Sequence, residues 1–131
     1  MALMLAGCKD LPGPDQVKHL DGYWEIAQVE FPDGGTRDYP VNTTVDYYHL
    51  EGRKGYRKKL QPNADGTFAT SDDALPLQVV VQDGALILVF ESDSGTWEEH
   101  VEALTPEEMT LMHGNGLRYR YRKYEPINLN P

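Results

Sequence analysis

Turn-forming dipeptides that contain glycine recur at short intervals along the 131-residue chain. Asp or Asn followed by Gly tolerates the positive φ angles that tight turns between antiparallel strands require. The runs between these dipeptides are rich in Val, Tyr, Trp, Thr and Leu, which favour strands. The sequence therefore predicts a succession of short strands, with turns at Asp33-Gly34, Asp65-Gly66, Asp83-Gly84, Ser94-Gly95 and Asn115-Gly116.

The expected strands follow from these runs and from their alternation. Leu77, Val79 and Val81 would share one face of a strand, because side chains alternate between faces with a period of two. Residues 117–122 alternate in the same way, with leucine and tyrosines on one face and arginines on the other. Nine strands are predicted, at residues 22–31, 44–51, 54–61, 67–70, 77–83, 85–91, 96–104, 109–113 and 117–124.

Two short segments favour a helical conformation, namely residues 15–20 and residues 105–108. Thr105 is a suitable N-cap, and Pro106 suits the first helical position that follows it. The second segment is too short to form more than a turn between strands.

Eight or nine consecutive strands with tight turns form an antiparallel meander. Closing the meander into a barrel removes the exposed edges that would invite aggregation. The predicted fold is all-β, an antiparallel up-and-down barrel of about eight strands, with an open sandwich as the alternative. The interior of such a barrel is either filled by side chains or holds one small ligand.

Length and charge exclude several classes of protein. A chain of 131 residues forms one domain with a real core. Its formal charge of −9 argues against a nucleic-acid partner, which needs a cationic surface. Nine of the twelve Lys and Arg residues lie in segments 53–59 and 118–123. Solvated strand faces paired with acidic neighbours are favoured there over an anion site.

The N-terminus carries the only cysteine, Cys8. Leu5-Ala6-Gly7-Cys8 resembles a lipobox, the site at which bacterial lipoprotein precursors are cut and lipidated. Residues 1–5 are apolar, like part of a signal peptide, and several acyl chains on one cysteine give stable anchoring. The alternative is an apolar N-terminal strand with a buried cysteine. The lipobox implies a lipid-anchored protein of the bacterial outer membrane, facing the periplasm or the cell surface.

The expected organisation has four parts. Residues 1–8 form a truncated lipoprotein signal with its lipobox, and residues 9–20, which include Pro12, Gly13 and Pro14, form a tether. Residues 21–125 form the barrel, and residues 126–131 form a C-terminal tail.

Residues 20–125 also carry a family likeness. Gly22-Tyr23-Trp24 resembles the Gly-x-Trp of the first lipocalin strand, and further segments resemble lipocalin-like lipoproteins of Bacteroidetes. These segments are 54–59, 65–68, 95–99, 104–111 and 119–121. The resemblance implies that Trp24 closes one end of the barrel and that Gly22 allows close backbone passage there. It also implies that Arg118, Arg120 or Arg122 packs over the tryptophan, and Arg120 is the residue assigned to this contact, a cation–π interaction of about 1–2 kcal/mol.

Catalytic and metal-binding patterns are weak in this sequence. The four histidines, His19, His49, His100 and His113, have no His or Cys partner at metal-ligand spacing. Glu98, His100 and Glu102 would share the outer face of a strand, where a solvated acidic face is favoured over a metal site. The sequence has no nucleophile elbow and no glycine-rich phosphate loop. We expect a non-catalytic protein without metal or cofactor, and a small barrel enzyme is the less favoured alternative.

The remaining expectation is binding inside the barrel. The main hypothesis is a small apolar ligand, and the alternative is an accessory envelope lipoprotein with a filled core that docks a protein partner through its outer surface. A small or filled interior is slightly favoured. The predicted interior residues are Trp24, Ile26, Tyr48, Val79, Leu88, Phe90, Trp97, Val101, Tyr119 and Tyr121.

Overall fold

Ten strands and one short helix make up the computed structural model, which describes residues 11–40, 42, 44–65, 67–70 and 74–125. Cys8 and the C-terminal tail lie outside these described residues. The elements are the 3₁₀ helix η1 (Pro14–His19) and strands β1 (Gly22–Glu30), β2 (Thr36–Asp38), β3 (Val45–Glu51), β4 (Lys54–Pro62), β5 (Phe68–Thr70), β6 (Leu75–Gln82), β7 (Ala85–Ser92), β8 (Gly95–Leu104), β9 (Glu108–His113) and β10 (Arg118–Lys123).

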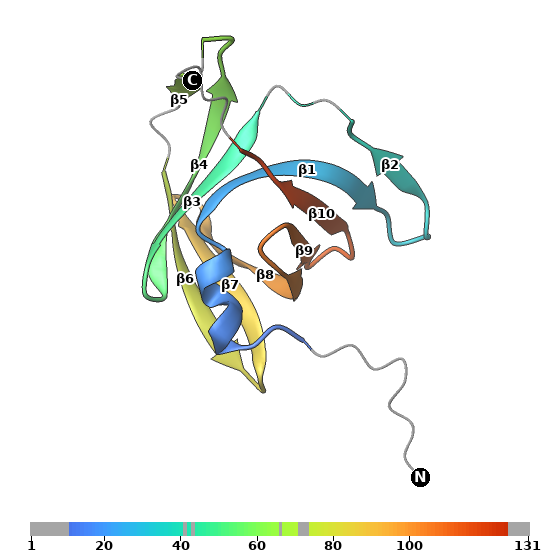
Figure 1. Ribbon diagram of the computed structural model, residues 1–131. Coiled ribbons are helices and arrows are strands. Elements are labelled where there is room, and N and C mark those ends of the chain that lie inside the picture. The colour runs from blue at the N-terminus through green and yellow to red at the C-terminus, as the bar shows by residue number, and fades with distance from the viewer. Residues whose placement is uncertain (1–10, 41, 43, 66, 71–73, 126–131) are drawn as a thin grey trace.

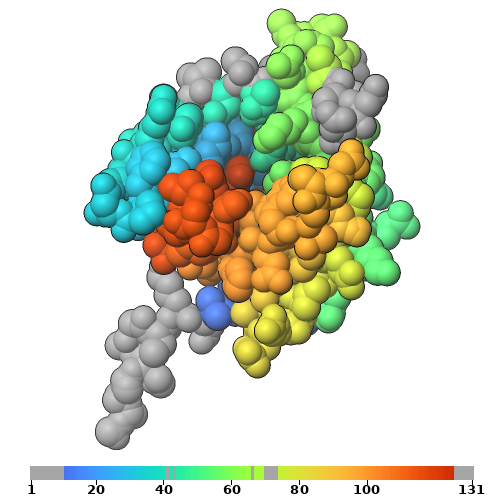
Figure 2. Space-filling model, turned by 180° about the vertical axis from the view of Figure 1, so that it is seen from behind, coloured from blue at the N-terminus to red at the C-terminus, as the bar shows by residue number. Residues whose placement is uncertain are grey.

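Eight of the strands close into an antiparallel barrel (Figure 1). The order around the ring is β1, β3, β4, β6, β7, β8, β9 and β10, and β10 returns to pair with β1. Strands β2 and β5 lie outside the ring, where β2 pairs with the end of β1 and β5 pairs with the end of β4. Figure 2 shows the closing seam from behind, where the surface of β10 adjoins that of β1. The predicted up-and-down barrel is confirmed, and the β10–β1 pairing distinguishes it from an open sandwich.

All nine predicted strands are present, with their ends within two residues of the prediction. Strand β2, whose three residues are all exposed, is not among the predicted strands. Thr36, Arg37 and Asp38 offer no apolar alternation, so the strand exists because β1 supplies its hydrogen bonds rather than because it buries a face.

The first predicted helical segment forms η1, which covers one end of the barrel (Figure 1). The side chain of Gln16 accepts a hydrogen bond from the amide of Gly13 at 2.9 Å and so fixes the start of the helix. Val17 and Leu20 are buried against the core, with 8% and 1% exposure. Residues 14–20 therefore pack onto the folded domain.

The second segment forms a turn without a helix. The hydroxyl of Thr105 accepts hydrogen bonds from the amides of Glu107 and Glu108 at 3.2 and 3.0 Å, as an N-cap would. Strand β9 begins at Glu108 and pairs with β8 and β10, so the backbone is already extended where a helical turn would continue.

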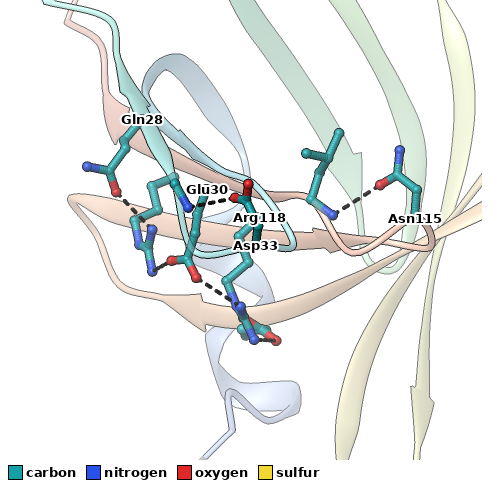
Figure 3. Close-up of polar contacts among 9 residues, drawn as sticks. Gln28, Glu30, Asp33, Asn115 and Arg118 are labelled. Carbon is teal, nitrogen blue, oxygen red and sulfur yellow. Dashed lines mark hydrogen bonds and ion pairs between the residues drawn. The ribbon is translucent and has the colours of Figure 1, made fainter.

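The arginines of β10 face outward and form ion pairs with glutamates of β1 and β8, and Figure 3 shows the contacts of Arg118. Arg118 pairs with Glu102 at 2.6 Å and with Glu30 at 3.3 Å, while Arg120 pairs with Glu30 at 2.8 Å. The third, Arg122, pairs with Glu25 at 2.6 Å. The hydrogen bond from Arg120 lowers the pKa of Glu30, which keeps that carboxylate charged. The expectation of basic side chains paired with acidic neighbours holds for this segment.

Candidate functional site

Trp24 closes the η1 end of the barrel, but its cationic partner is Lys123. The indole is fully buried, and its Nε1 donates a hydrogen bond to the carbonyl of Leu20 at 2.8 Å. The Lys123 ammonium lies 4.5 Å from the ring centroid and donates to the carbonyl of Asp21 at 2.8 Å. Partial burial lowers the pKa of Lys123. The assignment of Arg120 to this contact is wrong, because Arg120 lies on the outer face of β10.

Gly22 leaves the space that the Lys123 side chain occupies next to Trp24. Its φ angle is +123°, a conformation that residues with a side chain rarely adopt. A β-carbon placed on Gly22 would lie 2.6 Å from the Lys123 ammonium nitrogen. The glycine thus leaves room for the side chain that covers Trp24, in addition to allowing an unusual backbone angle.

The ten predicted interior residues all lie on the inward faces of their strands by register. Six of them fill the core and are at most 2% exposed, namely Trp24, Tyr48, Val79, Leu88, Phe90 and Val101. Trp97 packs against this core and stacks on Phe90 with ring centroids 5.3 Å apart. The other three, Ile26, Tyr119 and Tyr121, line a pocket, which Trp24 also borders. Much of the interior is therefore packed, and these residues border space for a ligand at one side of the core.

This pocket, called the mouth pocket below, lies where β1 separates from β3. Strand β1 pairs with β3 through residues 22–24 and with β2 through residues 28–30. Between them, the Asn42 side chain donates to the carbonyl of Ile26 at 2.8 Å. The pocket has a volume of about 260 Å³ and is lined by Trp24, Ile26, Val29, Tyr39, Thr44, Asp46, Lys59, Tyr119 and Tyr121.

One wall of the mouth pocket carries an ion pair. Asp46 on β3 and Lys59 on β4 are cross-strand partners, and the ammonium lies 2.9 Å from the carboxylate. The Asp46 side chain is only 9% exposed, whereas that of Lys59 is 64% exposed. The aspartate is therefore held inside the barrel by a lysine that reaches solvent through the mouth.

A second pair of opposite charges lies deeper, next to Asp46 and Tyr121. The Arg57 guanidinium packs over the Phe90 ring at 4.5 Å and lies 3.9 Å from the carboxylate of Glu99. Both side chains are nearly buried, with 12% and 9% exposure. Burial by itself lowers the pKa of Arg57, but the Tyr48 hydroxyl and the carboxylates of Asp46 and Glu99 outweigh it and raise that pKa. The arginine therefore stays charged inside the barrel.

Polar atoms around this deeper pair are incompletely satisfied. Trp97 donates a long hydrogen bond of 3.4 Å to Glu99, and His113 Nε2 lies 3.9 Å from the same carboxylate. The hydroxyl of Tyr48 and the Nδ1 atom of His113 are buried and have no hydrogen-bond partner among the described residues. Burial raises the pKa values of Tyr48 and Tyr121, so both hydroxyls stay protonated and can donate. The interior near the mouth pocket is thus polar and charged, which the sequence analysis did not predict.

The outer face of the barrel carries a group of contacting rings, the outer aromatic cluster. Tyr23 stacks on Phe68 at 5.3 Å and contacts Tyr47 at 4.8 Å. All of its members are half-buried and lie on the outward side of β1, β3, β4 and β5 or directly after β10. They are Tyr23, Tyr47, His49, Tyr56, Phe68 and Tyr124.

The predicted acidic face of β8 lies outside the barrel. Glu98 and His100 are exposed there, 3.6 Å apart, and Glu102 is tied to Arg118. Within the described ranges, no group of three or more His, Cys, Asp or Glu side chains comes together to hold a metal ion. No helix in the part of the chain that the structure describes is both long and apolar enough to cross a membrane.

The barrel resembles solved structures from Bacteroides. A lipocalin-like protein from Bacteroides uniformis matches with a TM-score of 0.51 and 17% identity, over 81% of this chain and 99% of that one. An uncharacterized protein from Bacteroides eggerthii matches with a TM-score of 0.50 and 18% identity, over 80% of this chain and 99% of that one. No protein-family model and no curated protein sequence matches the chain. The chain therefore has a lipocalin-like barrel fold.

Proposed function

We propose that this protein is a non-catalytic binding protein that holds a small molecule in the mouth pocket. The observation that carries the proposal is a pocket of about 260 Å³ beside the packed core of the barrel. Trp24, Ile26 and Val29 supply an apolar wall, while Asp46 and Lys59 supply a polar one. Apolar surface with a few convergent polar groups is typical of small-molecule sites.

A fluorescent apolar probe, N-phenyl-1-naphthylamine, tests this proposal. We expect saturable binding with an increase in emission, because the probe leaves water for the apolar wall. Replacing Ile26 by Trp fills the pocket and is expected to weaken binding by about tenfold or more, a loss of about 1.4 kcal/mol or more. Val80→Trp, a control on the outward face of β6, should leave binding unchanged. Equal binding by both variants, or no binding by the wild type, would contradict the proposal.

The second candidate function is docking of an envelope protein through the outer aromatic cluster. Six half-buried rings on one outer face are the observation that favours it, since aromatic residues are enriched at protein interfaces. The same probe experiment separates the two candidates. A barrel that takes up no probe would leave docking as the better account, because docking does not need an accessible interior.

We further propose that Cys8 is lipidated and holds the barrel at the outer membrane of a bacterial envelope. The support is the order Leu5-Ala6-Gly7-Cys8, followed within a few residues by the folded domain. Cys8→Ser, expressed from the native gene in the source organism, is expected to move the protein from the membrane fraction to the soluble fraction. Gly7→Ala keeps a small residue before the cysteine and serves as the control. A wild type and a Cys8→Ser variant that fractionate identically would rule out the anchor.

A further inference from the structure

The charged groups at the mouth pocket cancel one another. Asp46 and Lys59 line the pocket as one pair, and Arg57 and Glu99 form a second pair behind them. The two acidic and two basic side chains sum to zero. Because this balance exists without a ligand, a charged ligand would leave one charge uncompensated next to Asp46, whose side chain is only 9% exposed.

These groups nevertheless have free hydrogen-bonding capacity. An ammonium has three donors, and among the described residues Lys59 donates one hydrogen bond, to Asp46. The guanidinium of Arg57 is 3.9 Å from Glu99, beyond hydrogen-bond distance, so each group lacks a close partner in the other. The fully buried hydroxyl of Tyr48 lies behind the pocket, on the residue opposite Arg57 in the β3–β4 register. In the pocket itself, Lys59 offers donors and Asp46 offers acceptors side by side.

The apolar wall determines the rest of the ligand. Trp24, Ile26 and Val29 present apolar surface to the same pocket, where Trp24 is the cross-strand neighbour of Asp46. Tyr121, the cross-strand neighbour of Ile26, also lines the pocket. A molecule that satisfies both walls has an apolar body and a polar end. The polar end must donate as well as accept, because a carboxylate and an ammonium face it together.

We propose, on the basis of the proposed binding function, that the ligand is an electrically neutral amphipathic molecule whose polar end is amide-like, carrying a hydrogen-bond donor next to an acceptor. Asp46 and Lys59 are already paired with each other in the pocket wall, so a long-chain carboxylate or an alkylammonium must separate this pair to gain an opposite charge, and the displaced partner is then left without one. A neutral amide accepts from Lys59 and donates to Asp46 without separating them, so the site selects against both ions. The ligand expected from the sequence is apolar, whereas the ligand proposed from the pocket also has a specific polar end.

Three compounds with the same eight-carbon chain test the inference: octanamide, octanoate and octylammonium. Each is titrated at pH 8 against the protein loaded with N-phenyl-1-naphthylamine. Octanamide is expected to displace the probe with a dissociation constant about tenfold lower than that of either ion. Octanoate or octylammonium binding as tightly as octanamide would overturn the inference while the proposed function stands, and so would the failure of octanamide to displace the probe. A protein that does not bind the probe would overturn the proposed function as well.

Charge variants of the pocket wall sharpen the test. Asp46→Asn leaves one uncompensated positive charge, so octanoate should gain about tenfold in affinity relative to octanamide. Lys59→Gln leaves one uncompensated negative charge and should favour octylammonium by a similar factor. Lys58→Gln is the matched control, because Lys58 is the neighbour of Lys59 on the outward face of β4. Identical selectivity in Lys59→Gln and Lys58→Gln would contradict the assignment of this wall to the ligand. The wild-type series stands by itself if Asp46→Asn fails to fold.

Discussion

Replacing Trp24 by alanine is expected to lower the free energy of unfolding by about 3–5 kcal/mol. The indole is fully buried at the η1 end of the barrel, so the substitution leaves a large cavity. It also removes the hydrogen bond to the carbonyl of Leu20 and the ring beneath the Lys123 ammonium. Urea denaturation followed by far-ultraviolet circular dichroism measures the loss.

Lys123→Met is the comparison for this experiment. It removes the cation but keeps an unbranched apolar side chain over the ring, so we expect a smaller loss of about 1–2 kcal/mol. In the double variant the two losses should fall short of their sum, because both residues contribute to one contact. A Trp24→Ala loss below about 1 kcal/mol, or strictly additive losses, would show that Trp24 and Lys123 do not close the barrel as described.

Replacing Gly55 by alanine is expected to cost about 3 kcal/mol or more, above the usual range for an added methyl group. A β-carbon on Gly55 would lie 1.8 Å from the carbonyl oxygen of His49 and 2.9 Å from the Cα of Leu50. Both atoms belong to the backbone of β3, which cannot rotate away as a side chain would. Relief requires the β3–β4 pairing to shift, and that pairing also positions Asp46, Arg57 and Lys59.

Gly114→Ala provides the matched control for this prediction. Gly114 lies in the turn between β9 and β10, and a β-carbon there meets no atom within 4 Å. The control should change stability by less than about 0.5 kcal/mol. If the two alanine variants prove equally stable, the close approach of β3 and β4 is not a feature of the folded protein.

The fold was largely accessible from the sequence because strand formation leaves a local signal. Turn dipeptides mark the ends of the strands, and alternation such as that of residues 77–82 marks their faces. Closure of the barrel has no such local signal, and the Gly22–Trp24 motif indicated it only by resemblance. The extra strand β2 was missed because its three exposed residues show no apolar pattern.

The sequence does not predict the charged side chains of the interior. Alternation divides the side chains of a strand into two faces, but it does not show which face points into the barrel. On β4 the inward residues are Gly55, Arg57 and Lys59, whereas Tyr56 and Leu60 face outward toward the aromatic side chains of neighbouring strands. The more apolar face of this strand is the outer one, so hydrophobicity alone selects the wrong face. Only the cross-strand register, which brings Arg57 opposite Tyr48, settles the assignment.

The inward positions of Glu99 and Lys123, in contrast, follow from the alternation of the sequence. Trp97 and Val101 were assigned to the interior, and a period of two places Glu99 between them on the same face. Tyr119 and Tyr121 likewise imply that Lys123 faces inward, which identifies the cation over Trp24 and excludes Arg120. The alternation thus contains both side chains, Glu99 between Trp97 and Val101 and Lys123 two residues after Tyr121.

Native mass spectrometry of the protein purified from its source organism tests ligand binding in the mouth pocket without an added probe. We expect one small neutral molecule bound per chain, released on denaturation and absent from the Ile26→Trp variant. The wild type would then differ from the variant by the mass of that ligand as well as by the substitution. A wild-type protein that carries no bound molecule, and that also fails to take up N-phenyl-1-naphthylamine, would contradict ligand binding in the mouth pocket.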